Sequence, residues 1–379
     1  MELETLRAEI DQIDTELVDL FKKRMETCMQ VAQYKKENGV RVLDRARERE
    51  ILAKVEAQAG EKLDYHAHML YSVLFDLSRS YQTTLLCEET ELTARIQDAI
   101  AHTGAFPRRG TVACQGVEGA YSQAACDKLF QMPGIMYFNS FENVFQAVEQ
   151  GLCDFGILPI ENSSNGSVNK VYDLMRHYKF HIVRSVRLHI DHRLLGNPGA
   201  TMEDIKEIVS HEQAIGQCSA FLEKHPGVRL TVVENTAIAA KMVAESGRLD
   251  IAAISSPDCA QLYGLAVLHS HIQNSENNYT RFICIAKDLA IYPGADRVSL
   301  MMTTAHTPGA LYRVLAQFAS LGLNLTKLES RPIVGSDFDF LFYFDLEASV
   351  YSKDVVRILG ELSKTDQLFV FLGSYSEAK

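Results

Sequence analysis

A short polar run in the middle of the chain combines groups that can bind a small ligand and exchange protons with it. Residues 161–165 read Glu-Asn-Ser-Ser-Asn and supply a carboxylate, two amides and two hydroxyls. The apolar run 155–160 before them is typical of a buried strand, and the apolar spacing over 168–175 predicts a helix with Ser167 as its N-cap. Open α/β sheets bind ligands where a strand meets a helix N-terminus. The first three polar residues, Glu161, Asn162 and Ser163, are therefore candidate site residues.

Polar residues gather in the same way at other expected strand-to-helix turns. With Glu161-Asn162, the turns at Tyr121-Ser122, 210–213, 234–236 and Ser255-Ser256 make five, and they add Ser122, Ser210, Gln213 and Thr236 to the candidates. The strand at 279–286 is apolar except at its first residues, where Thr280 and Arg281 stand. Strands are expected near 111–115, 135–138, 155–160, 182–188, 229–234, 251–254 and 279–286, and helices between them include 141–150 and 201–208. This alternation predicts a mainly parallel sheet with helices on both faces. Five polar turns on one side of one sheet predict a cleft.

The first ninety residues have a different pattern, in which charged and polar residues interrupt apolar helical stripes. The first stripe predicts a helix of some 35 residues ending near Asn38-Gly39, which is a rod of ~50 Å and too long to pack within a 90-residue globule. The polar residues on or beside the three expected helices are Arg7, Arg24, Lys35, Asp44, Arg47, Glu48, Ser78 and Gln82. Cations on an apolar stripe require an anionic partner. Together these side chains predict a site for a small dianion.

Arg7 and Arg24 are too far apart to hold one small ligand within a single chain. They are separated by 17 residues, which is ~26 Å along a helix. We therefore expect the long helix to pair with a second copy, so that Arg7 of one protomer joins Arg24 of the other.

This N-terminal pattern resembles the all-helical chorismate mutases over residues 3–85. The resemblance implies rearrangement of chorismate to prephenate, a reaction without nucleophile or proton transfer, in which conformation and charge at the ether oxygen matter. It implies that the arginines clamp the two carboxylates, that Lys35 and Gln82 face the ether oxygen, and that Glu48 binds the hydroxyl.

The middle region resembles prephenate dehydratase over about 175 residues. The motifs that carry this resemblance are Gly-Val-Glu-Gly-Ala-Tyr-Ser at 116–122, Pro-Ile-Glu-Asn-Ser at 159–163, Ser-His-Glu-Gln at 210–213, Gln-Cys at 217–218 and Thr-Arg-Phe at 280–282, the last two of which add Gln217 and Phe282 to the candidates. It implies loss of CO2 and hydroxide from prephenate to give phenylpyruvate. Thr280 would donate to the departing hydroxyl, and Glu161 and Asn162 would orient the substrate. Helix N-termini near Ser122 and Thr236 would take carboxylates. Arg281 has two possible partners, a substrate carboxylate or Glu161.

Residues 297–375 follow the order strand, helix, strand, strand, helix, strand, which is ferredoxin-like. Two motifs within them, Gly309-Ala310-Leu311 and Glu329-Ser330-Arg331-Pro332, resemble the ACT regulatory domain. This resemblance implies phenylalanine as an effector. The alternative is a dimerisation sheet that binds no ligand.

Composition limits the classes of protein that fit. A net charge of −11 argues against nucleic-acid binding, and no apolar run approaches the ~18 residues of a membrane span. The eight cysteines are scattered without a C-x-x-C pair, and no dinucleotide, Walker or H-E-x-x-H motif occurs, so neither a metal nor a cofactor is expected. The acidic start lacks a signal-peptide core, which favours a cytoplasmic protein.

We therefore predict a multidomain protein: an all-α mutase domain at 1–88, a linker at 89–110, a two-lobed α/β dehydratase domain like the periplasmic binding proteins at 111–289, and an α+β ACT domain at 297–375. Two alternatives remain for the function. One is a non-catalytic sensor of a small ligand, and the other is arogenate as substrate in place of prephenate. Departures at Cys114–Val117, Glu212 and Ala237-Ile238 from the usual dehydratase pattern leave the substrate preference open. A mutase joined to a dehydrogenase is disfavoured by the missing dinucleotide motif.

Overall fold

The computed structural model describes residues 3–38, 45–85, 89–333, 340–364 and 368–378. It divides into two compact units. The first contains residues 1–93 with 309–317 and 357–365, and the second contains 94–308, 318–356 and 366–379. None of the helices in the described ranges combines the length and the apolar character needed to cross a bilayer.

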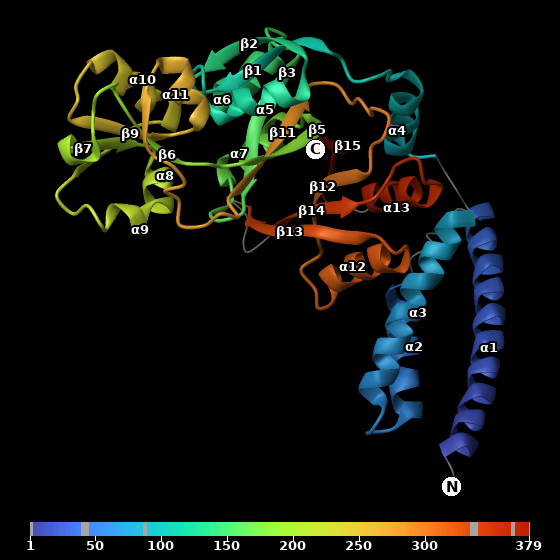
Figure 1. Ribbon diagram of the computed structural model, residues 1–379. Helices are drawn as coiled ribbons and strands as arrows, with labels where there is room; N and C mark the ends of the chain where they lie inside the picture. Colours follow the sequence, from blue (N-terminus) through green and yellow to red (C-terminus); the bar gives the residue numbers. More distant parts are fainter. Residues whose placement is uncertain (1–2, 39–44, 86–88, 334–339, 365–367, 379) are drawn as a thin grey trace. The chain divides into compact units, whose positions relative to one another are not determined.

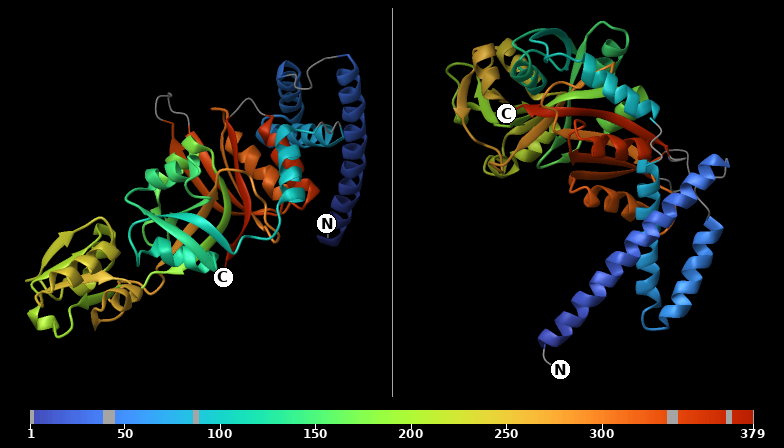
Figure 2. Two further views of the ribbon diagram at one scale, coloured as in Figure 1. Left: turned by 90° about the horizontal axis from the view of Figure 1, so that it is seen from above. Right: turned by 90° about the vertical axis from the view of Figure 1, so that its right-hand side faces the viewer.

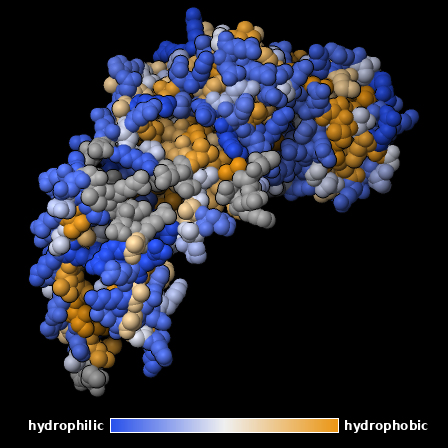
Figure 3. Space-filling view, turned by 180° about the vertical axis from the view of Figure 1, so that it is seen from behind, coloured by the Kyte–Doolittle hydropathy of each residue, from blue (hydrophilic) through white to orange (hydrophobic). Residues whose placement is uncertain are grey.

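Three long helices form the body of the first unit (Figure 1): α1 (Leu3–Glu37), α2 (Arg45–Ala59) and α3 (Asp64–Leu85). Helix α2 packs along α3, and α1 contacts α3. The predicted 35-residue helix is confirmed. Its stripe is exposed in the single chain, with Leu6, Ile10, Ile13, Leu17 and Leu20 between 39% and 63% accessible, and Figure 3 shows hydrophobic side chains along this helix. Asp44 lies outside the described residues.

The second unit contains the two lobes of the predicted α/β region. The first lobe has β1 (Arg109–Gln115), β2 (Met132–Phe138), β3 (Phe155–Asn162), β4 (Gly166–Ser167), β5 (His181–His189) and β11 (Tyr279–Ala286), with α5 (Tyr121–Leu129), α6 (Phe141–Glu149) and α7 (Asn169–Tyr178). Strand β3 lies between β1, which is parallel to it, and β11, which is antiparallel. Separate apolar cores on the two faces bury Phe130, which follows α5, and Phe145, which belongs to α6. Helix α4 (Glu91–His102) precedes this lobe.

The second lobe is built on its own sheet, in the order β10-β6-β9-β7-β8. Its strands are β6 (Arg193–Gly196), β7 (Glu207–Ser210), β8 (Arg229–Val232), β9 (Ile251–Ser255) and β10 (Ala266–His269), and its helices are η1 (Met202–Asp204), α8 (Glu212–Gln217), α9 (Ser219–Leu222), α10 (Thr236–Ser246) and α11 (Pro257–Tyr263). The chain enters this lobe after β5 and returns at β11, so it crosses between the lobes twice (Figure 1 and Figure 2).

Two predictions about this region are wrong. The five polar turns do not lie on one sheet, because those after β7, β8 and β9 belong to the second lobe. The helix expected over 201–208 is a single 3-10 turn followed by strand β7. Thr201 and Asp204 do form a capping box, but all four residues of β7 are buried, and that burial favours a core strand over a continued helix.

The C-terminal segment follows the predicted order with β12 (Arg297–Thr303), α12 (Ala310–Ser320), β13 (Asn324–Pro332), β14 (Phe340–Glu347), α13 (Lys353–Ser363) and β15 (Phe369–Ala378). Its sheet is antiparallel, in the order β13-β14-β12-β15. The end of β15 then pairs in parallel with β5, which joins this sheet to the first lobe. Gly373 makes the approach possible, because a Cβ there would lie 2.3 Å from the carbonyl oxygen of Ile182.

Candidate active sites

Asn162, the last residue of β3, is the centre of a hydrogen-bond network in the second unit. Its Nδ2 donates to Asn278 Oδ1 at 2.8 Å and to Thr280 Oγ1 at 2.9 Å. Its Oδ1 accepts the backbone N–H groups of Ser164 and Asn165, each at 3.0 Å. The side chain thereby ends the strand and fixes its own amide. Thr280 Oγ1 accepts from Asn162, and none of the hydrogen bonds found among the described residues uses the Thr280 hydroxyl proton, which is therefore available to a ligand.

Gln217 brings the second lobe into this network. Its Oε1 accepts Asn278 Nδ2 at 3.0 Å and lies 2.8 Å from His192 Nε2. Its Nε2 lies 3.5 Å from Asn162 Oδ1. The amide therefore connects a helix of one lobe to the strand end of the other. Burial lowers the pKa of His192, so the imidazole is neutral near pH 7.

Asn278 and His192 were not among the candidates. Asn278 stands two residues before Thr280 within the polar run 273–278, and this spacing was the available signal in the sequence. His192 follows a strand rather than opening a helix, so the strand-to-helix pattern did not include it.

Glu161 is held by two cations from different parts of the chain. Arg281 Nε lies 2.6 Å from its Oε1, and Lys327 Nζ lies 2.6 Å from its Oε2. Burial raises the pKa of Glu161, but Arg281 and Lys327 outweigh it and lower the pKa below its ordinary value. The carboxylate is therefore ionised at neutral pH and acts as an acceptor. Arg281, only 5% exposed, also pairs with Asp345 of β14, so its guanidinium is taken up by two protein carboxylates.

The other candidates of the second unit are not among the residues whose side chains form the hydrogen-bond network around Asn162. Ser122, Ser210 and Phe282 are each at most 5% exposed. Ser210 Oγ donates to the carbonyl of Ile254, and Phe282 lies in the apolar core. Ser163 Oγ donates to the carbonyl of Asn277, next to the network. Gln213 is exposed, and Thr236 is half-buried at the start of α10.

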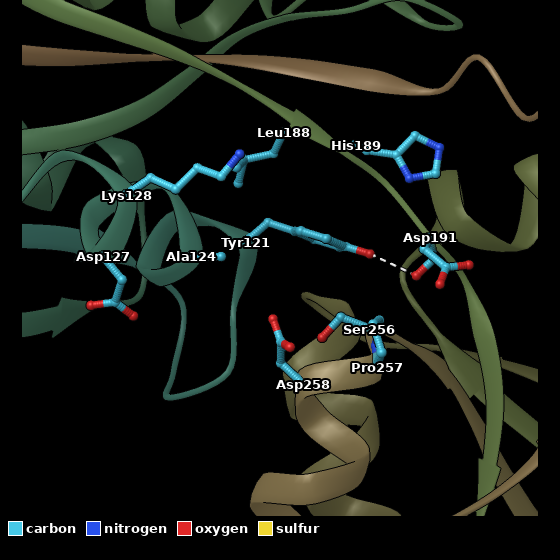
Figure 4. Close-up of a pocket in the computed structure, with 10 residues that line it drawn as sticks. All are labelled: Tyr121, Ala124, Asp127, Lys128, Leu188, His189, Asp191, Ser256, Pro257 and Asp258. Carbon is cyan, nitrogen blue, oxygen red and sulfur yellow. Dashed lines mark hydrogen bonds between the residues drawn. The ribbon is translucent and has the colours of Figure 1, made fainter. Parts of the chain in front are cut away.

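A cavity of about 460 Å³ lies between α5, the end of β5 and α11 (Figure 4). Tyr121 reaches across it and donates to the carbonyl of Asp191 at 3.0 Å. The residues lining it do not include Glu161, Asn162 or Thr280, so it is distinct from the network.

In the first unit, the structure brings three of the predicted residues together. Arg24 of α1 donates to Ser78 of α3 and lies over the ring of Phe75, with 5.6 Å from Cζ to the ring centroid. Gln82 Nε2 donates to the carbonyl of Cys28 one turn further along α1, at 3.0 Å. Lys35 is half-buried near the end of the same helix.

The remaining candidates of the helical region are placed differently. Glu48 pairs with Arg79. Arg79 was not among the candidates, because it is one of several polar or charged residues on its turn of the helix and nothing in the sequence distinguishes it. Arg47 is exposed and pairs with Glu50 at 2.7 Å. Arg7 is exposed on α1, 17 residues from Arg24.

The two C-terminal motifs lie in different units. Gly309 has φ +75° ahead of α12, a conformation that favours glycine, and Ala310 and Leu311 begin that helix. In β13, Glu329 accepts a hydrogen bond from the hydroxyl of Ser167 at 2.6 Å and Arg331 pairs with Asp173 at 3.1 Å, whereas Ser330 and Pro332 are exposed.

Ser167 is not the helix cap that was predicted, because its hydroxyl donates to Glu329. It lies in β4, and α7 begins after Val168 without a side-chain cap.

Comparisons with known proteins match both regions of the chain. The family model of chorismate mutase type II matches residues 6–83, and that of prephenate dehydratase matches residues 112–290. The bifunctional chorismate mutase/prephenate dehydratase of Escherichia coli K12 is 32% identical over 98% of this chain and 95% of its own length. Arogenate dehydratase/prephenate dehydratase 1 of Arabidopsis thaliana is 40% identical over 70% of this chain and 71% of its own.

A solved structure is also similar. The prephenate dehydratase of Arthrobacter aurescens, determined in complex with L-Phe, is 29% identical, with a TM-score of 0.64 over 71% of this chain and 90% of that one. The near full-length similarity to the E. coli protein spans both regions described above. The chain therefore belongs to the family of bifunctional chorismate mutase/prephenate dehydratases, enzymes of phenylalanine biosynthesis.

Proposed function

We propose that this chain carries out its two reactions at separate sites. Residues 1–88 rearrange chorismate to prephenate, and residues 111–289 convert prephenate to phenylpyruvate, with residues 89–110 as the linker. The observation that carries the second assignment is the network around Asn162, which leaves the Thr280 hydroxyl free to donate to a substrate.

At the dehydratase site, Thr280 donates to the hydroxyl of prephenate as its C–O bond breaks. The electrons of the breaking C–COO⁻ bond enter the ring, which becomes aromatic, while CO2 departs. The prephenate dianion thus yields phenylpyruvate, CO2 and hydroxide, and solvent restores the threonine proton. Asn162 and Gln217 fix the substrate, and Glu161 accepts a hydrogen bond that orients it. Because its carboxylate is ionised, Glu161 is not the acid.

At the mutase site, the substrate dianion is bound by cations and amides without a proton transfer. Arg24 and Arg47 take carboxylates, and Lys35 and Gln82 stabilise the charge that develops on the ether oxygen. Glu48 binds the substrate hydroxyl after exchanging its partner Arg79 for the ligand. We propose that Arg7 comes from a second copy, because the exposed stripe of α1 supplies an apolar surface for it.

Phenylalanine is the proposed effector of the ACT domain at residues 297–375. The structure of the Arthrobacter relative was determined in complex with L-Phe. Gly309 has a positive φ and no side chain, so a ligand could approach the backbone N–H groups there closely. Ser330 and Pro332 stand on the exposed side of β13 and are accessible to such a ligand.

Arogenate is a second candidate for the dehydratase substrate. A relative with 40% identity is described as both an arogenate and a prephenate dehydratase. Steady-state kinetics with each purified compound decide between them. A kcat/KM for prephenate at least tenfold higher supports the proposal, and the reverse ratio replaces prephenate by arogenate.

A further inference from the structure

Strand β13 of the C-terminal sheet turns three charged side chains toward the catalytic lobe. Along this strand half-buried residues alternate with exposed ones, and the half-buried set includes Lys327, Glu329 and Arg331. Each of the three bonds to a residue on or after β3. Lys327 contacts Glu161, Glu329 contacts Ser167, and Arg331 contacts Asp173.

The ammonium group of Lys327 is the most enclosed of these contacts. Its side chain is 13% exposed, and Nζ donates to Glu161 Oε2 at 2.6 Å and to Ser167 Oγ at 2.8 Å. It also lies 5.2 Å from the ring centroid of Tyr172, within the range of a cation–π contact. A lysine buried to this degree requires a fixed anion.

Both carboxylate oxygens of Glu161 are consequently held by ion pairs. Arg281 contacts Oε1 from β11, and Lys327 contacts Oε2 from β13, so rotation of the carboxylate breaks at least one ion pair. Arg281 is itself shared with Asp345. Among the ion pairs found in the described residues, Lys327 therefore pairs with Glu161 alone, whereas Arg281 pairs with two carboxylates.

We propose that Lys327 is a positioning residue of the dehydratase site, which fixes the Glu161 carboxylate toward the substrate from a strand outside the catalytic lobes. The proposal rests on the role proposed above for Glu161. It makes β13, which also carries the proposed effector residues Glu329 to Pro332, part of the active site.

Four variants of the full-length protein test this: Lys327→Met, Lys327→Arg, Glu161→Gln and Asp173→Asn. The last breaks the other cationic contact of β13, at a carboxylate whose side chain is 65% exposed, and so controls for docking of the strand. Dehydratase kcat and KM are measured across pH, with mutase activity as the measure of folding.

Lys327→Met should lower dehydratase kcat about 10–100-fold with a smaller change in KM, a loss of the size seen when partners that orient site residues are removed. The acidic limb of its pH profile should move to higher pH, because losing a cation raises the pKa of the Glu161 carboxylate. Lys327→Arg should restore most of the activity, and Asp173→Asn should stay near wild type.

Two results overturn the proposal while leaving the site intact. One is a Lys327→Met enzyme with wild-type kcat and pH profile beside an impaired Glu161→Gln. The other is an equal loss in Asp173→Asn, which would assign the effect to docking. An unimpaired Glu161→Gln enzyme instead removes the proposed role of Glu161 itself, and this inference with it.

Discussion

Replacing Thr280 by valine should remove the proton donor of the dehydratase and leave the fold intact. Thr280 pairs with Asn162 on one side and with Leu188 on the other, in the middle of the sheet. Valine keeps the β-branched shape that suits this position. Among the described residues, the side-chain hydrogen bond that is lost comes from Asn162 Nδ2 at 2.9 Å.

The cost of Thr280→Val in folding free energy depends on the other acceptors around the Asn162 amide. Besides Thr280, Asn278 Oδ1 lies at 2.8 Å and the carbonyl of Tyr279 at 3.2 Å from Nδ2. An amide nitrogen carries two hydrogens, so both still find acceptors after the substitution. The folding free energy should therefore change by no more than about 1 kcal/mol.

The rate should fall far more than the stability. General acid catalysis by a placed side chain contributes about 10²–10⁴-fold, which corresponds to about 3–5 kcal/mol of activation free energy. Phenylpyruvate formation from prephenate at neutral pH, measured with mutase activity on the same sample, checks this. Thr231→Val is a matched control, because that half-buried strand threonine donates to Glu207 in the other lobe, away from Asn162. A Thr280→Val enzyme within threefold of wild type would refute the assignment.

Three further predictions concern the other sites. Lys35→Ala should lower mutase turnover about 10²–10³-fold, as loss of a transition-state donor does, and leave dehydratase turnover near normal; equal loss of both activities in parallel assays would argue against separate sites. Mixing inactive Arg7→Ala and Arg24→Ala proteins should restore mutase activity, because a mixed dimer holds one intact shared site; no recovery, with subunit exchange verified by native mass spectrometry, speaks against sharing. Gly309→Leu should keep prephenate turnover without phenylalanine and lose most of the inhibition, which coupling of about 1–3 kcal/mol sets at 5–150-fold; wild-type protein that binds no phenylalanine at millimolar levels in calorimetry would reject the effector site.

Local pattern was sufficient for the elements whose signal lies within one stretch of chain. The 35-residue helix was predicted from its apolar periodicity and the strand at 155–160 from its apolar run, and the structure contains both. Pattern failed where a local signal and tertiary burial compete. Thr201 and Asp204 form the expected capping box, yet the following residues are buried as a strand. Ser167 precedes a real helix, but its hydroxyl is used by Glu329, which lies 162 residues later.

The candidate site was predictable in its residue types but not in its partners. Asn162, Gln217 and Thr280 meet as their motifs suggested, because strand ends and a helix of the second lobe bring them together. Glu161 pairs instead with Arg281 and Lys327. The ion pair between Lys327 and Glu161 joins two residues that are 166 positions apart in the sequence. Local periodicity cannot predict a contact between residues so far apart. The same limit applied to Arg281, which pairs with Glu161, one of its two predicted partners, and also with Asp345 of β14, which no local pattern indicated.

The central claim is that one chain converts chorismate to phenylpyruvate through prephenate at two sites. The most direct test supplies purified protein with chorismate alone and identifies the products over time in the wild type and in Thr280→Val. The wild type should consume chorismate and release phenylpyruvate and CO2 in equal amounts. The variant should consume chorismate at the wild-type rate and accumulate prephenate in its place. Phenylpyruvate from the variant, or chorismate left unconsumed by both proteins, would contradict the account.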